Sequence, residues 1–568
     1  MLYRQEHPRP QFIRKDWKNL NGEWDFEIDH SISGDARGLM NDGAAFSRKI
    51  QVPFCPESKL SGVEYVDFMR CVWYRRSFTA TPEQLQGRIL LHFGAVDYEA
   101  NVYINGQLCG SHKGGYSSFH FDITDYVVAG ENALVVQALD DTRDPLIPSG
   151  KQCHEYASKG CMYTRSTGIW QTVWLEYVPK TYIVSTKYTT DIEAGTVHIS
   201  ATVIGNGEFK AEAFYNGKPM GSARTTSYGG CAQLTINLSE IHLWEAGNGR
   251  LYDLVLTYGE DRVESYFGLR SLTLDGHRFL LNGKSFFQRL VLDQGYYPDG
   301  IYTAPSDEDL VKDIQRGIDM GFDGARLHER VFEERYLYHC DRMGYLVWGE
   351  YPNWGLDHCD PAALSAVLPE WIEVVQRDFN HPAIVSWCPF NETSNAKGRP
   401  HHDALLANTY KVTKAIDPTR PCIDTSGYFH VITDIFDVHT YQQDPEAFTK
   451  YYESMAVDGT FYDFCSHSQT PKKGQPMFVS EYGGIGFSLD ESAWGYGNAP
   501  TSREEYLQRL KGLTDVLLDN PYMMGLCYTQ LYDVEQEQNG LYTYSRQPKF
   551  SPEEIAPIFR RKAAIEEI

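Results

Sequence analysis

Two glutamates of this 568-residue chain each follow an apolar run with the character of a buried strand. Glu392 closes the run that starts at Ala383, and Glu481 follows the run that starts at Pro476. A (β/α)8 barrel places its reacting groups at the C-terminal ends of parallel strands. A carboxylic acid and a carboxylate that face each other across a sugar can cleave a glycosidic bond. The pair therefore predicts glycoside hydrolysis.

A mechanism that retains the anomeric configuration needs carboxyl groups about 5–5.5 Å apart and in different environments. The acid should be pushed towards its neutral form, and the nucleophile should be kept ionised by nearby donors. Arg326 and Tyr441 are the expected donors to Glu481. Asn391 is expected to bind the substrate hydroxyl next to the anomeric carbon. Alone, each such side chain would be read as a helix cap or as part of a buried polar network, and their joint occurrence at strand ends favours catalysis.

Other polar and aromatic residues near the predicted strand ends have two interpretations each. A polar side chain can bind a ring hydroxyl or brace the barrel rim, and an aromatic face can stack on a pyranose or pack in the core. The candidates for hydroxyl binding are Asp293, Gln294, His328, Glu350 and His439, and those for stacking are Trp348, Trp354 and Trp494. Lys151 and Arg165 are expected to face solvent unless their loop folds over the barrel.

The pattern of elements predicts three domains. Residues 1–179 contain short alternating runs between Gly, Asn and Asp turns, with an Asn105–Gly106 hairpin signal, and we expect a β-sandwich. Residues 180–271 repeat short strands about every ten positions, which predicts an immunoglobulin-like sandwich without chemistry. From residue 272 to 568, strands alternate with helical stretches and predict a (β/α)8 barrel. The predicted barrel strands are 285–292, 324–328, 346–350, 384–392, 421–425, 435–441, 476–483 and 524–531.

Composition excludes some classes of function. The net charge of −24 disfavours binding to nucleic acid or to an anionic membrane surface. The first residues lack the apolar core of a signal peptide, and the cysteines are scattered singly, so we expect buried thiols and a cytoplasmic protein. The groups 401–403 and 465–467 lack the ligand spacing of a zinc site, and we expect neither a metal nor an organic cofactor.

The chain resembles glycoside hydrolase family 2, the family of β-galactosidases and β-glucuronidases. The resemblance covers essentially the whole chain and implies a jelly-roll sugar-binding domain, an immunoglobulin-like domain and a TIM barrel. It also implies that Glu392 is the acid/base and Glu481 the nucleophile. The matching segments are 102–106, 114–124, 279–284, 321–326, 344–350, Asn391–Glu392 and 480–483.

Three departures from the family pattern concern the sugar that is bound. Met162 stands where classical members often have an acidic residue that reaches the sugar. Leu541 follows Asn539 by two positions, where glucuronidases carry the lysine that grips the sugar carboxylate. Tyr528 replaces a strand-eight tryptophan beneath the sugar ring of many relatives. These departures favour a neutral sugar.

We therefore predict a retaining exo-β-glycosidase that releases a terminal sugar, most simply a β-galactoside, through a covalent glycosyl-enzyme. A β-glucuronidase or galacturonidase with another cation in place of the lysine, or an arabinopyranosidase, is the alternative within the family. A non-catalytic carbohydrate-binding protein is the alternative of another class. The expected partner is a small glycoside or oligosaccharide, and the resemblance makes a homo-oligomer plausible.

Overall fold

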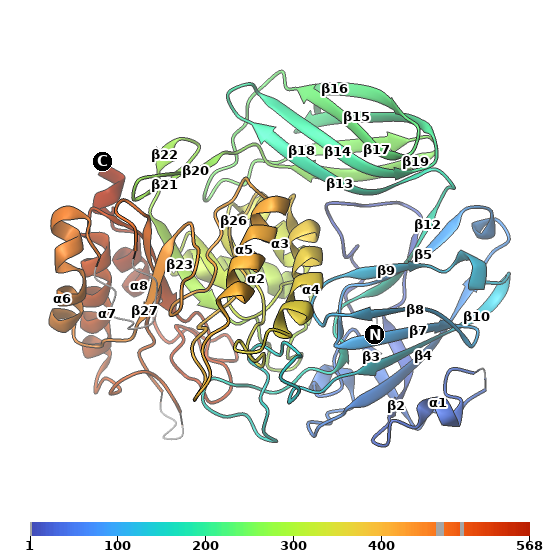
Figure 1. The fold of residues 1–568 in the computed structure, drawn as a ribbon, viewed down its shortest axis with the longest axis horizontal. Helices are drawn as coiled ribbons and strands as arrows, with labels where there is room; N and C mark the ends of the chain where they lie inside the picture. The colour runs from blue at the N-terminus through green and yellow to red at the C-terminus, as the bar shows by residue number, and fades with distance from the viewer. Residues whose placement is uncertain (1–2, 42, 462–470, 489–492, 568) are drawn as a thin grey trace.

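The computed structural model describes residues 3–41, 43–461, 471–488 and 493–567, and Figure 1 shows three regions. The N-terminal region is an antiparallel sandwich with sheets ordered β1-β12-β5-β9 and β3-β2-β4-β10-β7-β8. The predicted hairpin is confirmed, because Asn105 (φ 53°) and Gly106 (φ 78°) join β7 to β8. Its elements are β1 (Trp17–Asn19), β2 (Gly22–Ile28), α1 (Gly34–Arg37), β3 (Arg48–Val52), η1 (Lys59–Ser61), β4 (Cys71–Ala80), η2 (Gln84–Gln86), β5 (Arg88–Phe93), β6 (Val96–Asp97), β7 (Glu99–Ile104), β8 (Gln107–Lys113), β9 (Phe119–Asp122), η3 (Thr124–Tyr126), β10 (Gly130–Leu139), β11 (Gly168–Ile169) and β12 (Val173–Val178).

The second region is a smaller sandwich, drawn in green in Figure 1, of sheets β13-β14-β17 and β16-β15-β18-β19. Alternate residues of these strands point inward, as in β17, where Ala232, Leu234 and Ile236 are buried between exposed neighbours. β12 ends and β13 begins on either side of the predicted division at residues 179 and 180. The strands are β13 (Tyr182–Asp191), β14 (Thr196–Ile204), β15 (Gly207–Tyr215), β16 (Lys218–Ser227), β17 (Gly230–Asn237), β18 (Tyr252–Tyr258) and β19 (Asp261–Phe267).

The C-terminal region is the TIM barrel, with a parallel sheet ordered β26-β25-β24-β23-β29-β28-β27 and preceded by the small sheet β20-β21-β22. The strands are fully buried, as expected for a sheet that helices cover. The elements are β20 (Leu272–Asp275), β21 (Arg278–Leu281), β22 (Lys284–Ser285), β23 (Gln288–Asp293), α2 (Asp307–Asp319), β24 (Gly324–Leu327), α3 (Glu334–Met343), β25 (Leu346–Glu350), α4 (Ala363–Asp378), β26 (Ile384–Cys388), α5 (Asp403–Ile416), β27 (Phe436–Thr440), α6 (Pro445–Asp458), β28 (Met477–Gly483), α7 (Arg503–Leu518), β29 (Met523–Thr529), α8 (Pro552–Phe559) and η4 (Ala564–Glu567).

The predicted fifth barrel strand, 421–425, is the one that the structure does not form as a regular strand. This segment touches β26 through one isolated bridge, between Cys422 and Trp387, and Ile423 N donates to Trp387 O at 2.9 Å. The carboxylate of Asp424 accepts from the backbone N–H groups of Val431 and Ile432, at 2.5 and 2.9 Å. Side-chain bonds of this kind offer the backbone an alternative to a ladder. The segment therefore fills position five as irregular chain.

Local signals at the helix ends agree with the structure. The Ser306 hydroxyl accepts from Asp309 N at the start of α2, and the Glu554 carboxylate accepts from Ser551 N at 2.8 Å at the start of α8.

None of the helices in the described residues is long and apolar enough to cross a membrane. The cysteines of the described residues are free thiols, mostly buried as predicted, although Cys231 is exposed. Residues 465–467 lie outside the described residues.

Candidate active site

Glu392 and Glu481 converge on one site at the C-terminal ends of the barrel strands. Carboxylate oxygens of the two residues and a ring nitrogen of His439 all lie within 4.8 Å of one another. Retaining glycosidases hold their carboxyl groups about 5–5.5 Å apart, and inverting ones about 6.5–9.5 Å apart. An open cavity of about 570 Å³ adjoins the site at His439 and Tyr441. The spacing fits direct attack by one carboxylate, without room for a water between the pair.

Both carboxylate oxygens of Glu481 accept hydrogen bonds. Arg326 Nη1 donates to Oε1 at 2.9 Å, and the Tyr441 hydroxyl donates to Oε2 at 2.5 Å. These are the two donors that the sequence predicts. Donors on both oxygens stabilise a carboxylate and fix the direction in which it points. This is the environment that a carboxylate nucleophile needs.

Arg326 is fully buried and links the residues of the site. Its Nη2 donates to Asn391 Oδ1 at 2.6 Å, and its Nε donates to Glu350. The carboxylates of Glu350 and Glu481 hold the pKa of the Arg326 guanidinium well above its usual range, despite burial. Glu350 thus braces Arg326, which is the second of its two predicted interpretations.

His439 lies between the two catalytic candidates. Its Nδ1 donates to Glu392 Oε1 at 2.7 Å, and its Nε2 lies 3.5 Å from Glu481 Oε1. Burial works against the charged form of each group, but the neighbouring carboxylates raise the pKa of His439, and this histidine lowers the pKa of Glu392. The sequence expectation was an acid pushed towards neutrality. The free site differs because the contact with His439 favours the charged form of Glu392.

Glu392 is held in an unusual backbone conformation just beyond β26. Its φ of 51° lies in the left-handed region, and its N–H donates to Ser426 O at 2.8 Å. Strain of this type is tolerated where surrounding contacts enforce it. Asn391 is held by Asn353, which accepts from Asn391 N at 2.6 Å. The Nδ2 group of Asn391 is buried and has no partner among the described residues, so this donor is available to a substrate hydroxyl.

Two predicted sugar contacts, Trp348 and Tyr528, are wrong because these side chains are committed to the barrel core, whereas the prediction for Asp293 stays open. Trp348 is fully buried, donates to Gln288 Oε1 at 2.9 Å and packs on Phe478. Tyr528 is fully buried, and its hydroxyl bonds to the Tyr506 hydroxyl of α7 at 2.6 Å, away from the site. Asp293 accepts from Gly295 N and from the Tyr336 hydroxyl of α3, and burial raises its pKa to about 6.

Other predicted residues remain compatible with a sugar contact. His328 is buried with its Nδ1 4.0 Å from Glu481 Oε1, and burial lowers its pKa well below the usual range. Gln294 is buried, and its Oε1 has no partner among the described residues. Trp494 is half-buried beside Tyr496, whose ring stacks on Tyr441 at 3.4 Å. The sequence alone gave no signal for Tyr496.

Lys151 and Arg165 correct a second expectation, because both are buried. Arg165 bonds to backbone carbonyls of its own domain, including Cys153 O at 3.0 Å, and stacks on Phe68. Lys151 lies with its Nζ 3.6 Å from the centre of the Trp354 ring, at the barrel rim. The loop does fold over the barrel, and only one of its two cations arrives at the site.

Behind the site, His430 joins two buried aspartates. Its Nδ1 bonds to Asp424 at 2.8 Å, and its Nε2 lies 3.2 Å from Asp437 Oδ1. Asp437 in turn accepts from the hydroxyls of Ser426 and Ser480, the residue before Glu481. This network supports the backbone that carries the nucleophile candidate.

We expect this network to make folding stability depend on pH. Although burial opposes it, the aspartates raise the pKa of His430 from 6.5 to about 10, so the folded state binds the proton more tightly than the unfolded chain. The contribution is complete below pH 6.5 and is lost as the pH rises through about 10. Urea unfolding midpoints should fall over this interval in the wild type, and less steeply in His430→Asn. His154→Asn, a change at an exposed histidine, is the control and should behave as the wild type. If the urea midpoint of His430→Asn falls with pH as steeply as that of the wild type, the assignment is contradicted.

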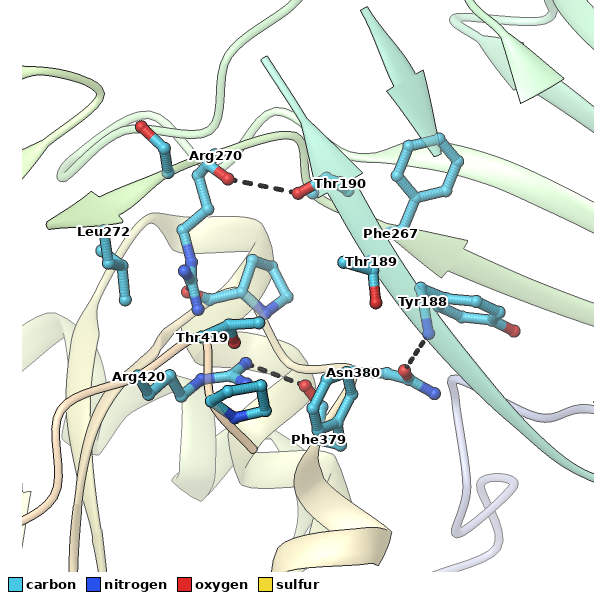
Figure 2. Close-up of a pocket in the computed structure, with 14 residues that line it drawn as sticks. Tyr188, Thr189, Thr190, Phe267, Arg270, Leu272, Phe379, Asn380, Thr419 and Arg420 are labelled. Atoms are coloured by element: carbon cyan, nitrogen blue, oxygen red, sulfur yellow. Dashed lines mark hydrogen bonds between the residues drawn. The ribbon is translucent and has the colours of Figure 1, made fainter. Parts of the chain in front are cut away.

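A separate cavity of about 250 Å³ lies between the second sandwich and the barrel (Figure 2). Arg270 donates from there to Pro382 O and Ile384 O, at the N-terminal start of β26. Tyr188 N donates to Asn380 Oδ1 at 2.8 Å and ties the two domains together. Because Glu392 follows the opposite end of β26, this cavity is a domain junction and not part of the candidate active site.

Comparison with known proteins decides the family. Residues 17–179 match the family model "Glycosyl hydrolases family 2, sugar binding domain", and residues 274–489 match "Glycosyl hydrolases family 2, TIM barrel domain". The chain belongs to glycoside hydrolase family 2. As a member of this family, it is a β-glycosidase with a jelly-roll domain and a TIM barrel, as the sequence predicts.

Its relatives include proteins of two substrate classes. The β-glucuronidase of Canis lupus familiaris is 26% identical over an alignment of 620 positions, gaps included, which covers 97% of this chain and 90% of the relative. A β-galactosidase of Thermoanaerobacter pseudethanolicus is 26% identical over 408 residues, covering 66% of this chain and 51% of the relative. The chain spans half the length of a putative β-glucuronidase of Formosa agariphila, at 26% identity over 72% of this chain.

Solved structures share the fold of this family member. A β-glucuronidase of Ruminococcus gnavus in complex with D-glucuronic acid has a TM-score of 0.79 at 17% identity, covering 98% of this chain and 100% of that one. A β-glucuronidase of an uncultured Clostridium species has a TM-score of 0.79 at 21% identity, covering 97% and 99%.

Proposed function

We propose that this family 2 β-glycosidase is a retaining exo-enzyme for β-linked uronic acids, in the manner of a β-glucuronidase. The observation that carries the mechanism is the convergence of Glu392 and Glu481, with carboxylate oxygens within 4.8 Å. The names of its relatives support the substrate class, since β-glucuronidases occur among both the sequence relatives and the structural ones. This proposal replaces the galactoside preference that we drew from the sequence.

The reaction follows from the hydrogen bonds of the site. A Glu481 oxygen attacks the anomeric carbon, the bond to the departing oxygen breaks, and Glu392 gives that oxygen a proton. His439, whose Nδ1 lies 2.7 Å from Glu392 Oε1, supplies this proton to Glu392 when substrate binds and takes it back from Glu392 after the second step. Water then loses a proton to Glu392 and attacks the anomeric carbon, which frees Glu481. Arg326 and Tyr441 keep Glu481 oriented throughout.

A β-galactosidase remains the second candidate. The β-galactosidase of Thermoanaerobacter pseudethanolicus favours it, and so does Leu541, where glucuronidases of this family carry a lysine.

A panel of 4-nitrophenyl β-glycosides separates these functions. We expect the purified protein to release nitrophenol fastest from the glucuronide or the galacturonide, and the anomeric configuration of the first product to be retained by NMR. The galactoside, glucoside and arabinopyranoside are the controls. A kcat/KM highest for the galactoside would favour the second candidate, and binding without any release of nitrophenol would refute hydrolysis.

A further inference from the structure

Lys151 reaches the barrel from the N-terminal domain on a loop that is fixed at both sides. Ser149 N donates to Trp354 O at 2.8 Å, and Gly150 N donates to the same oxygen at 3.0 Å. On the other side, the Gln152 amide donates to Asp97 Oδ2 at 2.8 Å inside the jelly roll. The position of the lysine is therefore set by two domains at once.

Gly150 shows how closely this loop sits on the barrel. Its φ is 55°, and a Cβ atom at this position would lie 2.5 Å from Glu329 O. A glycine is needed there both for the left-handed backbone and for the close approach. Because the backbone at Gly150 is held this closely against the barrel, the next residue, Lys151, has little freedom to turn away from the site.

The ammonium group of Lys151 has no anionic partner of its own. Only 5% of the residue is exposed, no carboxylate of the described residues lies within 4.0 Å of Nζ, and Nζ lies over the Trp354 ring. Trp354 Nε1 donates to Asn391 O at 3.3 Å, next to Glu392. A largely buried ammonium that lacks an ion-pair partner favours the binding of an anion.

Lys151 interacts electrostatically with its own loop and with the candidate active site. Although burial opposes this, Cys161 and the carboxylates of Glu537, Glu392 and Glu481 raise the pKa of Lys151. The positive charge of Lys151 adds to burial in lowering the pKa of His328. Lys151 is therefore close enough to the two catalytic candidates to interact with their charges, while its Nζ remains more than 4.0 Å from their carboxylate oxygens.

We propose that Lys151 binds the carboxylate of the terminal uronic acid and replaces the barrel lysine that is absent at Leu541. This inference rests on the proposed function, because it names the residue that selects the substrate class. Of the family motif, Asn539 remains, but its amide is committed to Glu537 at 3.1 Å and to Gln530 at 2.7 Å. The cation is thus supplied by a different domain.

Glu537 is the neighbour that an incoming carboxylate would meet. It is buried and accepts hydrogen bonds from the Tyr163 hydroxyl and from Asn539. Burial raises its pKa, while the charge of Lys151 and the hydrogen bonds from Tyr163 and Asn539 oppose this shift. Tyr163 also comes from the N-terminal domain, and its N–H donates to Lys151 O at 2.7 Å. The two domains meet at this point of the pocket.

The test is the specificity of Lys151→Met. Removing one member of a buried charge pair should reduce kcat/KM for the preferred 4-nitrophenyl uronide about 30-fold or more. Activity on the 4-nitrophenyl galactoside should change less than about threefold, because a neutral sugar gains no ion pair. Lys151→Arg should retain most of the uronide preference. Lys159→Met, a change at an exposed lysine of the same loop, is the matched control.

The outcomes separate this inference from the proposed function. Equal losses on uronide and galactoside in Lys151→Met would show a general electrostatic role and overturn the inference. A wild type that hydrolyses only the galactoside would overturn the uronide proposal itself. If Lys151→Met folds poorly, binding of D-glucuronic acid to Lys151→Arg and to Lys151→Gln gives the same decision: loss only in the glutamine variant supports the ion pair, and equal binding refutes it.

Discussion

Glu481→Gly should lower kcat on an aryl β-glycoside by roughly 10⁴-fold or more, because no other group can form the covalent intermediate. Arg326 and Tyr441, which both donate to Glu481, would be left facing an empty site. Added azide fits this space and can attack the anomeric carbon in place of the carboxylate. It should restore turnover and give a glycosyl azide of inverted configuration, identified by NMR.

Glu392→Ala provides the contrast that assigns the two roles. The variant lacks the proton donor but keeps the nucleophile, so substrates with good leaving groups should still form the glycosyl-enzyme. Azide should then speed the second step and give a product of retained configuration. An azide product of inverted configuration from Glu392→Ala would reverse the two assigned roles. Near-full activity in Glu481→Gly would show that Glu481 is not the nucleophile. Glu446→Ala, on the exposed start of α6, is the control for a surface glutamate.

The barrel strands could be predicted because each is a short apolar run that ends in polar residues. The predicted strand 346–350 agrees with β25 residue for residue, and the runs that end at Glu392 and Glu481 lead into the site. The exception, 421–425, has the same apolar character. What ends its pairing is the contact of Asp424 with backbone groups seven and eight positions later. A pattern of hydrophobicity does not contain that contact.

Residue roles within the site were harder to predict than its location. Trp348 and Tyr528 have the side chains of sugar platforms, but strands alternate their faces, and both rings point into the packed interior. A shift of one residue decides between cavity and core: the hydroxyl of Thr529, next to Tyr528, contacts Tyr441 at 3.1 Å. Packing between neighbouring strands decides the register to within one residue, and a single sequence does not determine that packing.

Lys151 was expected to face solvent for a different reason. Its loop belongs to the jelly roll, and no local pattern indicates that the loop lies on a barrel more than 120 positions downstream. The nearest signals are Gly150, whose left-handed φ permits close contact, and the missing lysine at Leu541. Only the folded structure shows that the lysine absent at Leu541 of the barrel and the buried Lys151 of the N-terminal domain concern the same pocket.

Arg326→Met should cost both stability and activity, and the two effects have separable causes. The guanidinium pairs with Glu350 and Glu481, so its removal leaves two buried carboxylates without their cation. Loss of one partner of a buried pair typically costs about 3–5 kcal/mol of unfolding free energy. Activity should fall at least about 10²-fold, because Glu481 loses the donor that fixes one of its oxygens.

The double variant Arg326→Met/Glu350→Gln tests this separation. Neutralising Glu350 removes one uncompensated charge, so part of the lost stability should return in urea unfolding. Activity should stay low, because Glu481 still lacks its donor. Arg224→Met, at an arginine on the surface of the second sandwich, is the control and should change neither quantity. Recovery of activity together with stability would mean that Arg326 serves only to neutralise Glu350, and that the nucleophile needs no donor other than Tyr441.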